Sequence, residues 1–367
     1  MRNIAFLICK LKENNTIINT IGLVIFGILI FGGCQSNGAP SDDVVTIPDE
    51  IYLIDEADDL EFDYDEEAID DEFYQFTDQS EWLTLFDFGL IADLTSESMR
   101  EFETRHAVSQ SQERYLAFGA FVPTVNRESS RILALQAFEF QAIELLSNFW
   151  SITDRAGALV QLSSLSTANG QSPIANEIFH RFVKNGQLEL LDLFDEIDIT
   201  GLENVYAVSA RRAERMVNEF IEAGDLEDEY FDEAVDILTY MFLVERINSG
   251  LEAYLGAKAI LIEFFGFTES ELLAIPSLAA WDYGRTTIIA RYGVLAGYLD
   301  EDEAWYYLHQ AANNAAATYS CWREYTAAHI LGRALAFGND STDMIGTLNF
   351  LLNDNESPFN RIQFNGR

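Results

Sequence analysis

The sequence predicts an all-α protein: a single multi-helix, bundle-like domain preceded by a signal peptide and an acidic, largely disordered arm. From about Ser80 onward, apolar residues recur at spacings of three and four, the period of an amphipathic helix. These segments begin at Ser, Thr or Asp and end at Gly, and the prolines lie outside the long ones. Hydrophobic residues make up 49% of the 367 residues, which excludes a wholly disordered chain.

The chain divides into four parts: a lipoprotein signal peptide (1–33), an acidic tether (34–80), the helical domain (81–355) and a C-terminal tail (356–367). The signal begins with basic residues and continues in an apolar run, residues 17–31. This run has about 15 residues, fewer than the roughly 20 that a membrane-spanning helix needs.

Cys34 follows two glycines, and this arrangement resembles the lipobox of bacterial lipoprotein precursors, with Phe31 where Leu, Ile or Val is usual. We therefore expect lipidation of Cys34 and a membrane-anchored lipoprotein. Because Gln35 rather than Asp comes next, we expect the outer membrane, with the protein facing the periplasm or the cell surface. The alternative is a chance Cys at the end of an ordinary signal peptide or short anchor.

The three cysteines support this interpretation. Cys9 lies in the signal, Cys34 at the proposed cleavage point, and Cys321 would then have no disulfide partner. A lone Cys beside Trp322 is more often a small buried apolar residue than a nucleophile, so we expect Cys321 to be buried.

The tether and the residues that follow it are strongly acidic: between Cys34 and Met99 there are 21 Asp and Glu and no basic residue. Such a block repels itself and should stay extended, holding the lipid anchor away from the folded body. Its acids alternate with aliphatic and aromatic residues, among them Phe73, Tyr74 and Phe76. This pattern leaves open a second interpretation, in which the segment docks on a basic, apolar partner or on its own domain.

The charge balance excludes some partners. The formal net charge is -39, from 61 Asp and Glu against 22 Lys and Arg. A chain of this composition has no basic surface for nucleic acid or for an anionic membrane. A basic protein partner remains compatible with it.

The helical domain is predicted to contain ten long helices with short loops between them, which favours antiparallel packing of neighbours. We expect loops at Gly186, Gly224, Gly250 and Gly266. The expected helices are 131–149, 154–166, 173–183, 203–223, 231–247, 251–265, 278–297, 301–319, 322–337 and 342–352.

Two of these helices carry polar residues on their apolar faces. Asp282 and Arg285 fall within the seam of helix 278–297, and His329 and Arg333 share the apolar face of helix 322–337 with Trp322. A buried charge is costly unless it is paired, so we expect Asp282 to pair with Arg285 or Arg333, and His329 to bond nearby.

Four further residues on or beside these helices have expected positions. Gly284 and Gly332 would let the two helices approach closely, each four residues after an Ala. Arg291 is nine residues from Asp282, about 180° around the helix, and should face another partner such as an acidic helix end. Glu303 should form a capping box with Asp300.

The same residues carry a family resemblance. The blocks are AWDYGR (280–285), AR (290–291), GYLDEDEAW (297–305), SCWREY (320–325) and GR (332–333), with a weaker match in FWSITDRAGAL (149–159). In this order they resemble the bacterial family called domain of unknown function 1266, over roughly residues 118–338. After the final GR, where that family tends to have an aromatic, this chain reads ALAF. The resemblance implies a single helical domain and no reaction, and its recurring residues form a candidate polar site.

Two functions of different classes remain. The first is a non-enzymatic, lipid-anchored module that binds a protein partner through its acidic surface or arm. The second is a hydrolase or transferase with a polar pocket around Asp282, Arg285, His329 and Arg333, where a His and a carboxylate act as acid and base. We assign no catalytic residue, metal site or cofactor, because the chain has no GxSxG, Walker, dinucleotide or HExxH motif. A water-filled cleft that reaches His329 would favour the enzyme, and a dry, paired network would favour the module.

Overall fold

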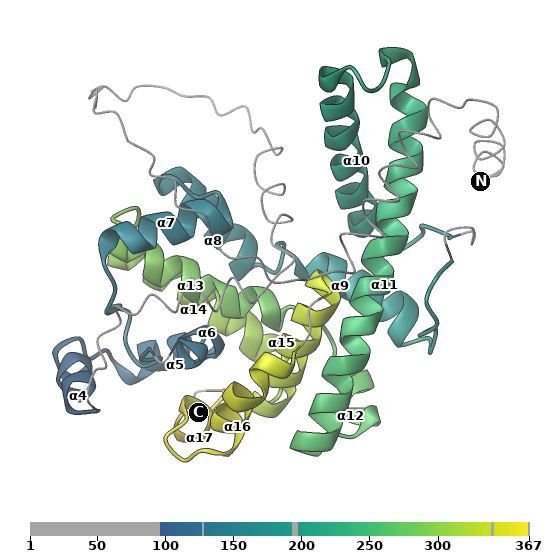
Figure 1. The fold of residues 1–367 in the computed structure, drawn as a ribbon. Helices are drawn as coiled ribbons and strands as arrows, with labels where there is room; N and C mark the ends of the chain where they lie inside the picture. Colours follow the sequence, from purple (N-terminus) through teal and green to yellow (C-terminus); the bar gives the residue numbers. More distant parts are fainter. Residues whose placement is uncertain (1–95, 127, 193–196, 339–340, 366–367) are drawn as a thin grey trace, which may run out of the picture. The chain divides into compact units, whose positions relative to one another are not determined.

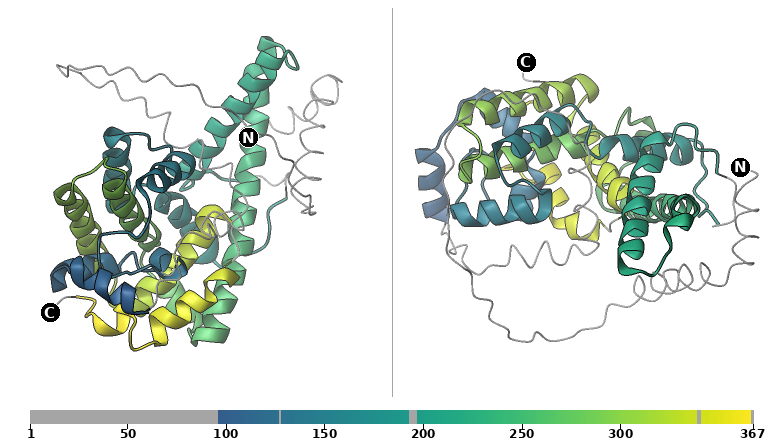
Figure 2. Two further views of the ribbon diagram at one scale, coloured as in Figure 1. Left: turned by 60° about the vertical axis from the view of Figure 1, so that its left-hand side comes forward. Right: turned by 90° about the horizontal axis from the view of Figure 1, so that it is seen from above.

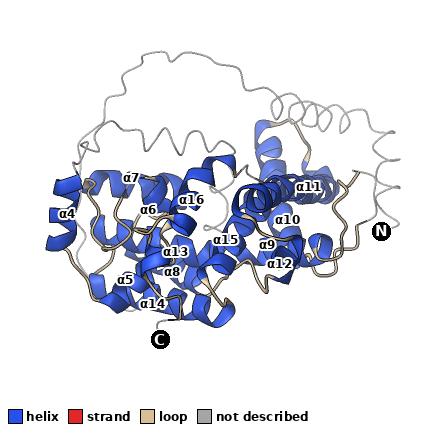
Figure 3. Cartoon of the chain, turned by 90° about the horizontal axis from the view of Figure 1, so that it is seen from below, coloured by secondary structure: helices blue, strands red, loops and turns tan. Residues whose placement is uncertain are grey.

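The computed structural model describes residues 96–126, 128–192, 197–338 and 341–365. Over these residues the chain forms helices joined by loops and contains no strand, so the all-α prediction is confirmed (Figures 1 and 3). None of the helices in these ranges is both long and apolar enough to span a bilayer. The signal peptide, Cys34 and the acidic tether lie outside the described residues.

The chain divides into two compact units. Among described residues, the smaller unit consists of Glu214–Ile237, the end of one helix and the start of the next, with a 3₁₀ turn at Asp228–Tyr230 between them. All other described residues belong to the larger unit. Every site discussed below lies within this larger unit.

Most of the helices follow one another with short connections, and the longer ones lie between Val125 and Glu139 and between Val183 and Glu203. In chain order they are α4 (Ser96–Arg105), α5 (Gln110–Ala117), α6 (Phe121–Val125), α7 (Glu139–Trp150), α8 (Arg155–Ser166), α9 (Ser172–Ile178) with a π-helical turn (Phe179–Val183), α10 (Glu203–Ala223), α11 (Phe231–Phe265), α12 (Glu269–Ala274), α13 (Ala280–Leu295), α14 (Glu301–Thr318), α15 (Trp322–Phe337), a 3₁₀ turn (Thr342–Met344), α16 (Ile345–Asn353) and α17 (Pro358–Arg361). The predicted ends of α10 and α15 are confirmed, and α8 and α14 begin and end within one residue of prediction.

Helix α13 is the central element of the larger unit. It lies beside α8 and α14 in Figure 1, and α13 and α14 remain adjacent in both views of Figure 2. The N-terminal part of α13, with Ala280 and Tyr283, belongs to one hydrophobic cluster that also contains α9 and α15. Its C-terminal part, from Ile288 to Tyr292, belongs to a second cluster built on α7 and α8. Asp282 and Arg285 therefore lie where two apolar clusters meet on one helix.

The close approach of α13 and α15 is confirmed. A Cβ atom at Gly284 would lie 2.6 Å from Cε1 of His329, and one at Gly332 would lie 2.8 Å from the carbonyl oxygen of Leu278. No real side chain tolerates such distances without a shift of its neighbours. Gly284 therefore lets the His329 ring approach α13, and Gly332 lets α15 approach the backbone just before α13.

Two differences from the predicted boundaries are large, whereas α13 is shorter than predicted by only two residues at each end. Residues 131–138 are not helical, and α7 begins at Glu139, because carbonyl groups of this segment bind the side chain of Arg291 instead of helical N–H groups. The expected loop at Gly250 does not exist, since α11 runs unbroken through it. A Cβ there would lie 2.9 Å from the carbonyl oxygen of Leu335, so this glycine serves close packing and not a turn.

Residues 356–365, which belong to the predicted C-terminal tail, pack against the helical domain. Phe359, Ile362 and Phe364 are buried in the first hydrophobic cluster. The indole of Trp322 stacks on Phe359 with ring centroids 4.3 Å apart, and its N–H donates to the carbonyl oxygen of Ile362 at 2.7 Å. Trp322 thus holds the C-terminal segment on the body.

Candidate functional site

The carboxylate of Asp282 is the centre of the predicted polar seam. It accepts hydrogen bonds from three successive backbone N–H groups before and at the start of α9: Gly170 at 3.0 Å, Gln171 at 3.1 Å and Ser172 at 3.0 Å. The first N–H groups of a helix have no partner within it and attract negative charge. Asp282 supplies the acceptor and the negative charge, although it lies about 110 residues further along the chain. Its side chain is fully buried.

Arg285 completes the charge balance. Its guanidinium donates to Oδ1 of Asp282 at 2.5 Å, one turn away on α13, so the predicted pair is confirmed. Three aromatic rings surround the same group, with centroids 4.9 Å (Trp281), 5.3 Å (Trp150) and 5.7 Å (Phe337) from Cζ. Burial lowers the pKa of Arg285, and the Asp282 charge opposes that shift. Phe337 is the last residue of the ALAF sequence that follows Gly332 and Arg333, and its ring is one of the three around Arg285.

His329 lies beside this cluster and is buried. Its ring stacks on Phe121 with centroids 3.7 Å apart, and Nδ1 lies 3.1 Å from the carbonyl oxygen of Ala280. A carbonyl can only accept, so Nδ1 carries the proton of the neutral ring. Burial lowers the pKa of His329 to about 3, and the charges of Arg333 and Arg285 act in the same direction.

This environment predicts a pH-dependent stability with a defined sign. An unfolded His titrates near pH 6.5. Between about pH 6.5 and 3, His329 is therefore protonated in the unfolded state but neutral in the folded state. The free energy of unfolding should therefore fall as the pH falls, by up to about 1.4 kcal/mol per pH unit from this group. Urea unfolding across this range should give a flatter profile for His329→Phe. The exposed His106→Phe is the control, and equal profiles for the two variants would contradict the assignment.

Arg333 does not join Asp282, contrary to one of the two predicted pairings. Its guanidinium binds the carboxylate of Asp343 in two places, at 2.9 and 3.2 Å. Asp343 lies in the 3₁₀ turn after α15, where the chain reverses at Gly338, and this turn brings it back over the last part of that helix. The turn that follows α15, and not the apolar face of the helix, therefore brings Asp343 to Arg333.

Arg291 faces away from the seam, as expected, but its partners are not a helix end. Nε donates to the carbonyl oxygen of Leu133 at 3.2 Å, and Nη2 donates to those of Ser129 at 2.9 Å and Ala134 at 3.1 Å. Nη1 lies 3.4 Å from a carboxylate oxygen of Glu128. Burial raises the pKa of Glu128, whereas Arg291 and the hydroxyl of Tyr292 lower it. Arg291 therefore holds the non-helical segment before α7 in place.

The remaining predicted residues have structural partners of their own. Glu303 forms the expected capping box with Asp300, and it also pairs with Arg155 at the start of α8. Cys321 is exposed, so the prediction of a buried thiol was wrong. It occupies the N-cap position of α15, at the corner where the chain leaves α14, and corners of this kind lie at the surface.

Two carboxylates that organise this region escaped the sequence analysis. Glu128 and Asp343 neutralise Arg291 and Arg333, yet neither lies on a predicted apolar face. A third, Glu177, accepts from the backbone N–H groups of Asn204 and Val205 at 3.0 and 2.9 Å and so caps α10 from outside. The only local signal for Asp343 was its place just after the glycine that ends α15.

The sequence model of one family, described as a protein of unknown function (DUF1266), matches residues 145–364, more than half of the chain. The chain belongs to the DUF1266 family. The match begins later than the resemblance suggested and extends through α16 and α17 to Phe364. No curated protein and no solved structure matches the chain.

Within the DUF1266 match, the predicted polar site separates into distinct clusters. Asp282, Arg285 and His329 lie together at the junction of the two hydrophobic clusters, with Trp281 in contact with both Arg285 and His329. Arg333, Arg291 and Glu303 each have a carboxylate or guanidinium partner elsewhere. The described residues hold no group of three or more metal-ligating side chains.

Proposed function

We propose that this DUF1266 protein is a non-enzymatic, lipid-anchored binding module for a basic, apolar protein segment. The observation that supports it is the burial of the candidate acid and base. Asp282 is 0% and His329 2% exposed, and the Asp282 carboxylate is already occupied by three backbone donors and Arg285. Neither group is placed to meet a substrate, which argues against the alternative hydrolase or transferase built on Asp282, Arg285, His329 and Arg333.

A surface on the first turns of α7 supplies the binding face. Phe138 is 55%, Phe140 61% and Ile143 37% exposed, and the two phenyl rings stack with centroids 5.7 Å apart. Large apolar side chains exposed side by side are typical of protein interfaces, where aromatic residues contribute most of the binding energy. We call Phe138, Phe140 and Ile143 the α7 patch.

The charge around the α7 patch determines the partner chemistry. Glu139 and Glu144 are exposed and adjacent to it in sequence, and neither has an ion-pair partner among the described residues. An apolar centre bordered by carboxylates suits a helix or loop that presents Lys or Arg around aliphatic or aromatic side chains. We therefore assign the partner as basic and apolar.

Site-specific photocrosslinking in the native membrane tests this function. A photoreactive residue at Phe140 should capture one dominant protein through a basic, apolar segment. The same residue at Phe264, a phenylalanine on α11 that is also 61% exposed and follows an exposed Glu, is the matched control and should not capture it. Reversing the charges with Glu139→Lys and Glu144→Lys should reduce capture about tenfold, the ratio that corresponds to 1.4 kcal/mol. Equal capture at both positions, or capture that ignores charge reversal, would contradict the proposal.

The lipid anchor is tested separately. Labelled palmitate should enter the wild-type protein and be absent from Cys34→Ser, which would also be released from the membrane fraction. Equal labelling of both proteins would exclude lipidation of Cys34 without affecting the α7 patch.

A further inference from the structure

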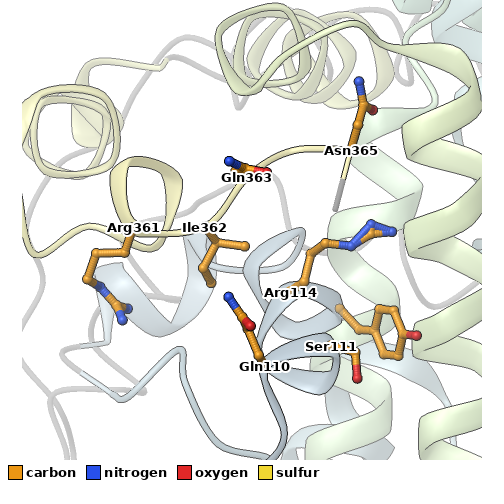
Figure 4. A pocket seen from close by; sticks show the side chains of 8 residues that line it. Gln110, Ser111, Arg114, Arg361, Ile362, Gln363 and Asn365 are labelled. Carbon is orange, nitrogen blue, oxygen red and sulfur yellow. The ribbon is translucent and has the colours of Figure 1, made fainter. Parts of the chain in front are cut away.

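A second surface of the larger unit is a half-open pocket of about 600 Å³, between α5 and the C-terminal residues 361–365 (Figure 4). Its volume lies in the range of ligand sites and far exceeds that of a single ion. The lining residues are Gln110, Ser111, Arg114, Tyr115, Arg361, Ile362, Gln363 and Asn365. None of these described residues is acidic, in a chain that carries 61 Asp and Glu.

Arg114 is the charged group that lacks a counter-charge there. It has no carboxylate partner in the described part of the chain, and its one hydrogen bond, to the carbonyl oxygen of Phe364, is 3.5 Å long. The guanidinium is held against the rings of Tyr115 and Phe118, with centroids 5.7 and 5.9 Å from Cζ. A partly buried, positioned guanidinium with so weak an acceptor favours the binding of an anion.

The rest of the pocket provides donors and an apolar wall. The side-chain amides of Gln110, Gln363 and Asn365 make no hydrogen bond within the described residues, and each can donate to a carboxylate. Figure 4 shows Arg361 at the opposite end of the pocket from Arg114, and that arginine is already paired with Glu113 at 2.8 Å. The Tyr115 ring and the Ile362 side chain are the apolar part of the lining. The pocket thus suits a carboxylate next to an aromatic or aliphatic side chain.

The same chain contains such a segment. Residues 70–76 read DDEFYQF, three acids followed directly by three aromatics within four positions. The 19 residues between this segment and α4 reach up to about 65 Å when extended, and a tethered ligand acts at an effective concentration near the millimolar range. A free peptide of the same composition would have to compete with that concentration.

We propose that the pocket between α5 and residues 361–365 binds segment 70–76 of its own chain, with a carboxylate on Arg114 and an aromatic ring against Tyr115 and Ile362. The contact fastens the end of the acidic arm to the folded body. It is independent of the α7 patch, which lies on other residues.

Carbodiimide crosslinking of the full-length protein tests this contact. In Arg114→Lys the new amine should couple to Asp70, Asp71 or Glu72, and mass spectrometry of mixed light and heavy-isotope protein should show coupling within one chain. The matched control is Arg155→Lys, on an exposed arginine whose partner is Glu303, where coupling to that glutamate is expected instead. We expect about tenfold more arm coupling at position 114 than at position 155, equivalent to 1.4 kcal/mol.

A second measurement leaves Arg114 unchanged. Phenylglyoxal should modify Arg114 slowly in the wild type and about tenfold faster when Asp70→Asn, Asp71→Asn and Glu72→Gln are combined, while Arg155 reacts at one rate in both proteins. Equal rates at Arg114, or arm coupling that is equal at positions 114 and 155, would overturn the proposal. Coupling between light and heavy chains would assign the occupant to a second copy and would overturn it too.

Discussion

Asp282→Asn should lose about 3 to 5 kcal/mol of unfolding free energy, the loss that follows when one partner of a buried ion pair is removed. Arg285 would keep its charge among three aromatic rings without the carboxylate it donates to. The amide NH₂ of Asn would also face backbone N–H groups at α9, donor against donor. Urea unfolding of the full-length protein measures the loss.

Asp154→Asn is the control for Asp282→Asn, because it makes the same change at an exposed aspartate. Asp154 caps α8 by accepting from the N–H of Gly157 at 2.8 Å, but it is exposed and has no arginine partner within the described ranges. Asn and Asp are about equal as N-caps, so Asp154→Asn should change stability by a few tenths of a kcal/mol. If the two variants lost similar amounts, the buried pair would not have the importance that its geometry indicates.

A double variant distinguishes the two roles of Asp282. If the residue served only to pair with Arg285, Asp282→Leu with Arg285→Leu would restore most of the stability. Because Asp282 also accepts from Gly170, Gln171 and Ser172, three backbone N–H groups would remain without that acceptor. We therefore expect the double variant to stay clearly below the wild type in the same urea experiment.

Arg291→Met should be the second large loss, again about 3 to 5 kcal/mol, because it leaves the partly buried Glu128 without its buried arginine and removes the donor to three carbonyl groups. Without Arg291, the largest influence that lowers the pKa of Glu128 is lost, so burial raises that pKa further, opposed only by the hydrogen bonds from Tyr292 and Asn126. A raised carboxyl pKa costs stability above that pKa and restores it as Glu128 becomes protonated. The deficit of Arg291→Met relative to wild type should therefore shrink as the pH falls, which unfolding at several pH values will show.

Arg155→Met is the matched surface substitution. Its guanidinium is 65% exposed, and a surface pair of this kind contributes about 0 to 1 kcal/mol. A loss at Arg155 as large as that at Arg291, or a deficit at Arg291 that does not depend on pH, would contradict the role assigned to Glu128.

The features that the sequence predicted well are those that depend on the residues of a single helix: its ends, its buried face and its contacts across one turn. The ends of α15 follow from Trp322 after the chain corner and from Gly338, which adopts a left-handed conformation at φ 69°. The burial of Asp282 and Arg285 follows from helical periodicity, because they fall on the same face as apolar neighbours. Their mutual pairing is a contact across one turn, which spacing alone predicts.

What the sequence did not predict depends on segments far apart in the chain. Nothing near Asp282 indicates that three N–H groups about 110 residues earlier approach it, and nothing near Arg291 indicates that carbonyls 157 to 162 residues away replace a helix there. Gly250 was misread for a related reason: the same residue type that ends a helix also permits another backbone to come close. Only the packed structure separates these two uses.

The position of α13 in both hydrophobic clusters has a consequence for how the larger unit unfolds. A helix shared by two clusters cannot leave one of them without exposing the apolar residues it presents to the other. The two clusters are therefore joined in a single cooperative unit, and a partly unfolded state that keeps one cluster while losing the other is penalised. The amide hydrogens of α13 should accordingly be among the slowest in the larger unit to exchange with solvent.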